Sequence, residues 1–459
     1  MTNQANSQIS GFNKSFLSVD LINGPIFKSL LLFAMPFFIS NMFQQFYNTA
    51  DTMIVGHLLG EESLAAIGAC TPIYDLLIGF ALGFGNGFSI VTARFFGARN
   101  KDDFSKAVSG SLVAGLIITL ITTITAQLSV YPLLKLLNTP DSIINEANSY
   151  ISTITLFVFV MFAYNLCSSL LRSIGNSFVP LIFLIISACT NIGLDYLFIG
   201  IFGLGIRGAA IATVISQGLS VLLCLVYIFK FCKILIPTKK DFAVGKKIYS
   251  ELISQGISNA LMSCLVSAGS VILQYGINGL GKYTIAGHTT ARKLFSFSIM
   301  PISSLGYSTT TFISQNRGAN KRDRIIKCLK GEYLYIFFAS MTIFVLMKLF
   351  APTLVHFVSG SDNSLIIDNG SKYLIYNSPF YIALGIVLTT RSSLQSLGMK
   401  ILAVISSLIE FVGKIIFVVV FIPKFGYNAV IFCEPAIWCF MAVYLIYTFF
   451  NAPYIRNKN

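Results

Sequence analysis

Long apolar runs separated by short polar loops follow one another along this 459-residue chain. An α-helix needs roughly 20 consecutive apolar residues to cross a hydrocarbon layer about 30 Å thick. By that length the pattern predicts twelve membrane-spanning helices: 27 to 54, 63 to 95, 104 to 130, 143 to 171, 177 to 200, 206 to 230, 248 to 278, 284 to 314, 325 to 350, 368 to 396, 401 to 422 and 428 to 450. The predicted fold class is therefore an all-α polytopic membrane protein.

The two halves of this pattern resemble each other. Gly205 and Gly426 lie 221 residues apart, and with a shift of two residues SSLLRSIGN (168 to 176) matches RSSLQSLGM (391 to 399). Because six crossings return a chain to the side on which it started, two such halves form parallel repeats, and we expect two six-helix bundles around a central cavity. The predicted domains are an N-terminal lobe at 1–231, a cytoplasmic linker at 232–247 and a C-terminal lobe at 248–459.

Composition narrows the class further. Hydrophobic residues make up 55% of the chain, charged residues 11%, and the mean hydropathy is +0.76, which excludes an ordinary water-soluble globule. The net charge of +14 is better explained by orientation in the membrane than by nucleic acid, because Lys and Arg concentrate in loops on one side. By the positive-inside rule both termini are cytoplasmic, and we expect a cell-membrane protein that contacts lipids and no nucleic acid. The nine cysteines include no CxxC pair, so no metal site is predicted.

One carboxylate stands out in the first predicted span. Asp51 lies inside an apolar run, where an Asp costs roughly 2.5 to 3.5 kcal/mol, so a functional role is the first hypothesis. Counting 1.5 Å per residue from the span ends brings Asp195 and Thr213 to about the same depth. Tyr47 precedes Asp51 by four residues, and Asn191 precedes Asp195 by four. Each therefore lies one helical turn deeper on the same face as its acid.

This cluster suits a proton or a sodium ion. Two neighbouring buried carboxyls repel each other as anions, and a shared proton or Na⁺ relieves that repulsion. Asn48 extends the polar stripe of the first span, and the candidate sodium ligands are Asp51, Asp195, Asn191 and Thr213. The alternative is that both acids only bind backbone or amide groups and lock the bundle.

The second half lacks this acid pair. With the two-residue shift, Asp195 corresponds to Val418. Instead, Lys414 lies one helical turn from Glu410, and Glu434 is expected near them on the last span. A structural salt bridge is the favoured interpretation, and a role in substrate or proton handling is the alternative.

Several motifs carry a resemblance to a known family. PFFISNMFQQFYNTAD (36 to 51), NIGLD (191 to 195), GAAIAT (208 to 213) and the two six-span repeats resemble the multidrug and toxic compound extrusion (MATE) family, and the spacing of fifteen from Pro36 to Asp51 resembles its prokaryotic DinF-like branch. The resemblance implies a monomeric, cofactor-free secondary transporter that exports organic cations or amphipathic drugs in exchange for protons or sodium by alternating access. It also implies that Asp51 and Asp195 are the coupling carboxylates and Pro36 a conformational hinge, with the remaining coupling contacts from Tyr47, Asn191, Thr213 and Asn48.

Two other classes of protein are alternatives. A lipid-linked oligosaccharide flippase of the same superfamily would need a cationic cavity lining for a pyrophosphate, and Arg292 facing the cavity would favour it. Asp75, in the second span, is instead a candidate contact for a cationic substrate. A membrane-embedded enzyme is not expected, because the chain has no GxxxxGK[ST] motif and its three histidines have no metal-site spacing.

Overall fold

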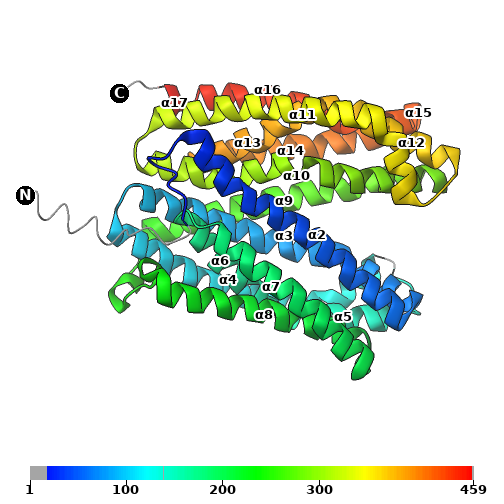
Figure 1. Cartoon of the computed structure of the whole chain (residues 1–459), viewed down its shortest axis with the longest axis horizontal. Coiled ribbons are helices and arrows are strands. Elements are labelled where there is room, and N and C mark those ends of the chain that lie inside the picture. Colours follow the sequence, from blue (N-terminus) through cyan, green and yellow to red (C-terminus); the bar gives the residue numbers. More distant parts are fainter. Residues whose placement is uncertain (1–17, 138, 457–459) are drawn as a thin grey trace, which may run out of the picture. The chain divides into compact units, whose positions relative to one another are not determined.

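The structure is a computed structural model that describes residues 18–137 and 139–456, so most of the predicted cytoplasmic N-terminal tail lies outside the described residues. Over the described ranges the chain is almost entirely helical and contains no strand. Figure 1 shows the α-helices, which are α2 (Ile26–Leu59), α3 (Glu61–Gly97), α4 (Lys101–Leu136), α5 (Ile144–Leu156), α6 (Val158–Ser173), α7 (Phe178–Asp195), α8 (Gly205–Phe231), α9 (Lys246–Asn278), α10 (Lys282–Gly318), α11 (Arg322–Ser359), α12 (Ser364–Asn377), α13 (Tyr381–Ser396), α14 (Lys400–Ile416), α15 (Ile422–Phe425), α16 (Tyr427–Phe450) and α17 (Pro453–Arg456).

Every predicted span is helical, and the all-α polytopic class is confirmed. Among the described residues, ten helical segments are long and apolar enough to cross a membrane, and α5 with α6, bent by 47° at a short break, makes an eleventh. Helix α10 occupies the remaining predicted span but carries Arg292 and Lys293 and does not belong to that set. By apolar composition alone the count is therefore ten or eleven, not the predicted twelve.

The internal repeat is visible in the backbone. Residues with positive φ, a conformation that favours glycine, recur at a constant offset. The pairs 221 residues apart are Gly60 and Gly281, Arg99 and Asn320, and Gly205 and Gly426, and the pair 223 apart is Gly175 and Gly398. Two π-helical turns, η2 (Tyr196–Ile201) after α7 and η6 (Phe417–Phe421) after α14, also begin 221 residues apart. Asp195 therefore corresponds to Ile416, and the predicted match with Val418 is wrong by two residues.

The chain divides into two compact units. Of the described residues, 18–20 and 35–260 form the first unit, and 21–34 and 261–456 form the second. The boundaries after residues 34 and 260 fall inside long helices, α2 and α9. The first part of α2 groups with the second unit, and the first part of α9 groups with the first unit. The predicted lobe boundaries at residues 231 and 248 describe the sequence repeat and not these compact units, so they stay a prediction.

The first unit is held by close helix packing. Helix α3 packs on α4 and α6, and α8 packs on α6 and α7. A Cβ atom on Gly87 would lie 2.6 Å from Cα of Gly256, and one on Gly83 would lie 2.6 Å from Cα of Ala260. Only glycine allows α3 and the first part of α9 to approach this closely. Arg94 and Glu251 form a two-pronged ion pair between the same two helices.

The second unit packs α10 against α11, α12 and α13, and α16 against α13 and α14. An aromatic cluster lies in its core. The Phe295 ring stacks on Trp438 with 6.0 Å between the ring centroids, and it meets Tyr381 edge-on with 5.3 Å between the centroids. The Tyr381 side chain is fully buried. This packing fixes α10, α13 and α16 around the charges described below.

Candidate functional site

The two acids predicted from the sequence lie together in the first unit. Asp51 comes from α2 and is 9% exposed, and Asp195 is the last residue of α7 and is fully buried. Their carboxyl groups lie close enough to share a hydrogen bond. Because a carboxylate can only accept, one of the two groups must carry a proton for this bond to exist. The Oδ1 atom of each acid is buried and has no hydrogen-bond partner.

An amide and a hydroxyl-bearing residue support Asp195. With the amide of Asn191 oriented to suit its neighbours, its nitrogen donates to Asp195 Oδ2 at 3.0 Å and its oxygen accepts from the backbone N–H of Thr213 at 3.2 Å. These contacts tie α7 to α8 next to the acid pair. The π-helical turn that follows Asp195 belongs to a kind of distortion that is frequent at functional sites.

Three tyrosines surround the pair. Tyr47 of α2 lies within hydrogen-bonding contact of Thr213 and in electrostatic contact with Asp51 and Asp195. Tyr74 of α3 and Tyr150 of α5 also lie in electrostatic contact with Asp51, and both were missed by the sequence reasoning. A signal existed for Tyr74, because Tyr47 and Tyr74 lie at nearly equal distances on either side of the turn at Gly60.

The pair has no cationic neighbour. Across residues 18–137 and 139–456, neither Asp51 nor Asp195 forms an ion pair. A buried anion without a cation is costly, so this arrangement is stable only when a proton or another cation neutralises the site. No group of three or more His, Cys, Asp or Glu side chains suited to a metal occurs in these ranges.

The structure does not bring the other predicted residues of this unit into the cluster. Asn48 and Asp75 are exposed, Asn48 on α2 and Asp75 on α3 beside Tyr74. Pro36 is buried inside α2, which continues as one helix across it. The adjacent ring of Phe37 lies 4.4 Å from the Arg172 guanidinium, which anchors α2 to α6.

A charge network occupies the second unit. Glu434 of α16 accepts from Arg292 of α10 at 2.7 Å and from the Tyr373 hydroxyl of α12 at 2.7 Å, and lies 3.6 Å from Lys414. Lys414 also pairs with Glu410 at 3.1 Å, as its i, i+4 spacing predicts. Arg292, which had no assigned partner, is thus held by an acid inside the second unit.

Arg391 of α13 completes this network. Its guanidinium donates to Glu410 at 3.4 Å and to the Ser406 hydroxyl at 2.9 Å. Three cations and two carboxylates therefore form one ion-paired network, in contrast to the acid pair of the first unit, which has no cation beside it. This satisfied geometry agrees with a structural salt bridge.

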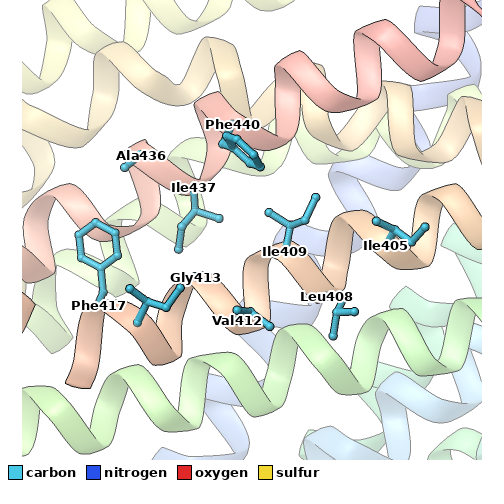
Figure 2. Close-up of a pocket in the computed structure, with 10 residues that line it drawn as sticks. Ile405, Leu408, Ile409, Val412, Gly413, Phe417, Ala436, Ile437 and Phe440 are labelled. Carbon is cyan, nitrogen blue, oxygen red and sulfur yellow. The ribbon is translucent and has the colours of Figure 1, made fainter. Parts of the chain in front are cut away.

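An apolar groove lies between α14 and α16 (Figure 2). Figure 2 shows Ile437 and Phe440 of α16 across the groove from Ile409 and Gly413 of α14. The groove has a volume of about 480 Å³, and its ten lining residues are all apolar or glycine. With no polar side chain it cannot bind a coupling ion, and its chemistry suits only an apolar group such as a lipid tail.

Comparisons with known proteins agree with this architecture. The family model described as MatE matches residues 36–197 and again 259–420, which reproduces the internal repeat. The "Probable multidrug resistance protein YpnP" of Bacillus subtilis (strain 168) is 26% identical over 85% of this chain and 87% of its own length. The "Multidrug export protein MepA" of Staphylococcus aureus (strain N315) is 25% identical over 89% of this chain and 90% of its own length.

Solved structures share the fold. A protein described as "Outward-facing conformation of a multidrug resistance MATE family transporter of the MOP superfamily" superposes with a TM-score of 0.88 at 23% identity and covers 97% of this chain and 100% of its own. At that identity the likeness concerns the fold alone. The two matches to the family model cover most of the chain, and the chain therefore belongs to the MatE family of multi-pass membrane transporters, which are not enzymes.

Proposed function

We propose that this protein is a secondary active antiporter that exports organic cations or amphipathic toxic compounds in exchange for protons. The observation that carries the proposal is the buried Asp51–Asp195 pair, which has no cation beside it and which a shared proton would neutralise. The multidrug export named for its relatives in Bacillus subtilis and Staphylococcus aureus supports the cargo class.

Exchange follows from charge balance at this site. When the shared proton leaves, a negative charge stays buried among side chains that cannot neutralise it. Only another cation, either the next proton or a positively charged cargo molecule, removes that cost. Because one site cannot hold both, loading of the proton and loading of the cargo exclude each other, which is the requirement for antiport by alternating access.

Helix α2 would transmit the change in charge at the acid pair. It carries Asp51, and it exposes a row of polar side chains on the face that includes Asn48: Gln44, Gln45, Asn48, Thr49 and Thr52. Exposed amides on a membrane-spanning helix suit cargo better than lipid tails. We propose Pro36 as the hinge, because proline removes one backbone hydrogen bond and so weakens the helix at that point.

Sodium is the alternative coupling ion. The free Oδ1 atoms of Asp51 and Asp195, with oxygen atoms of Asn191 and Thr213, form the all-oxygen set that a hard cation prefers. From the basic loops we propose that both termini are cytoplasmic. We also propose that the protein is a monomer among the lipids of the plasma membrane. No observation favours the flippase alternative, since Arg292 is engaged by Glu434 inside the second unit.

Transport in proteoliposomes tests the proposal. Asp51→Asn and Asp195→Asn should each abolish efflux of a fluorescent organic cation driven by a pH gradient, because neither variant can form the acid pair. Asp368→Asn, which removes an exposed carboxylate on α12, is the matched control and should transport like the wild type. A sodium gradient imposed separately identifies the coupling ion, and wild-type transport by Asp51→Asn would refute the assignment.

A further inference from the structure

A further buried acid, Glu332, lies in the second unit, outside the Asp51–Asp195 pair and the charge network around Glu434. Glu332 of α11 is 0% exposed. Its Oε1 atom lies 2.5 Å from the Thr309 hydroxyl of α10 and 3.5 Å from the Cys328 sulfur, while its Oε2 atom is buried without a hydrogen-bond partner. In the described part of the chain no Lys, Arg or His forms an ion pair with it.

The surroundings of Glu332 favour its neutral, protonated form. The Thr309 hydroxyl donates toward Oε1 at 2.5 Å and also lies 2.9 Å from the Leu305 carbonyl, so one shared hydrogen is the only support that α10 gives to a charge on Glu332. Because Oε2 is buried without a partner, the neutral carboxylic acid is the less costly state. An ionised carboxylate in this dry site would need water or a cation at Oε2, and neither has access while the helices stay packed.

The position of Glu332 links it to helix α2. The preceding residue, Gly331, packs directly against the Phe27 ring. A Cβ atom on Gly331 would lie 1.5 Å from that ring. One turn beyond Cys328, Arg324 donates to the backbone carbonyls of Leu21 and Gly24. Residues 21–34 thus dock on the same stretch of α11, and α2 continues from there to Pro36 and Asp51.

Few other titratable or charged groups face this acid. Its own helix contributes Cys328 and Tyr333, and the Tyr333 hydroxyl contacts Thr390 of α13 at 2.7 Å. Helix α10 contributes only the Thr309 hydroxyl, and Lys28 on the docked segment is exposed. The charge state of Glu332 therefore depends mainly on whether water reaches it.

We propose that Glu332 is a second proton-binding site of this transporter, whose ionisation releases residues 21–34 from α11. The inference rests on the proposed proton coupling but concerns a different unit and a different residue. Loss of the proton requires water at Oε2, water requires α10, α11 or the docked segment to separate, and separation frees the first part of α2. The proton on Glu332 thereby holds α2 in its docked arrangement.

Infrared difference spectroscopy of the purified protein in liposomes tests the site directly. In an Asp51→Asn/Asp195→Asn background, the C=O band of a protonated carboxyl should remain, decrease as the pH rises from about 5 to about 10, and disappear on adding Glu332→Gln. Thr309→Ala, which keeps the carboxyl, should shift the band's frequency. Ser340→Ala, a buried change two turns further along α11, is the control and should leave it unchanged.

Hydrogen exchange then tests the coupling to α2. At alkaline pH the amides of residues 21–34 should exchange faster in the wild type than in Glu332→Gln, and at acidic pH the two should agree. At each pH the wild type and the variant have the same intrinsic exchange rates, so these rates cancel in the comparison. A band that ignores pH or survives Glu332→Gln, or equal exchange at every pH, overturns the inference, whereas wild-type efflux by Asp51→Asn refutes only the proposed function.

Discussion

Removing the carboxylate of Glu434 separates a structural role of the second-unit network from a transport role. Glu434→Gln keeps the shape of the side chain and can still accept from Tyr373, but it leaves Arg292 without its acid partner. Lys414 keeps Glu410 at 3.1 Å. In the variant, the partly buried guanidinium of Arg292 therefore has no carboxylate beside it.

The magnitude follows from burial. Breaking a buried ion pair by removing one partner costs about 3–5 kcal/mol. The Arg292 side chain is 34% exposed and the Glu434 side chain 6%, so solvent screens part of the loss and the lower end, about 3 kcal/mol, applies. For domains of 150–250 residues each kcal/mol lowers the melting temperature by about 2–4 °C, so we expect a decrease of roughly 6–12 °C.

The assay is thermal unfolding of the purified protein in detergent, followed by intrinsic fluorescence, with efflux measured below the transition. Asp368→Asn is the matched control, because its pair with Lys372 lies on the surface of the same unit, and no measurable change in melting temperature is expected. An unchanged melting temperature for Glu434→Gln together with lost efflux would refute the structural interpretation and favour proton or substrate handling by Glu434.

Two further predictions concern the contact between α3 and α9. Gly87→Ala should destabilise the protein by about 1–3 kcal/mol, because its methyl group meets the backbone of Gly256, whereas Gly68→Ala, with open space around it on the same helix, should be neutral or stabilising in the same melting assay. Reversing one charge at a time in the Arg94–Glu251 pair should lower the melting temperature, and the double reversal Arg94→Glu/Glu251→Arg should recover about 1 kcal/mol. Additive effects of the two reversals would contradict a direct pair.

The sequence by itself determined the class and the repeat. Apolar run lengths predicted the helical segments, because a hydrocarbon layer sets a minimum length for each helix that crosses it. Depth and the 3.6-residue period predicted that Asp51, Asp195 and Thr213 share one level, since Asp51 and Asp195 lie toward the ends of α2 and α7 and Thr213 toward the start of α8.

Only the tertiary structure decided the partners. Helical period gives the faces of one helix but not its rotation toward a neighbour, so the sequence did not find Tyr74 or Tyr150 beside Asp51, and it included Asn48, which is exposed. Glu332 went unnoticed for the same reason. Its burial and its contact with Thr309 depend on how α10 packs on α11, which no local pattern specifies.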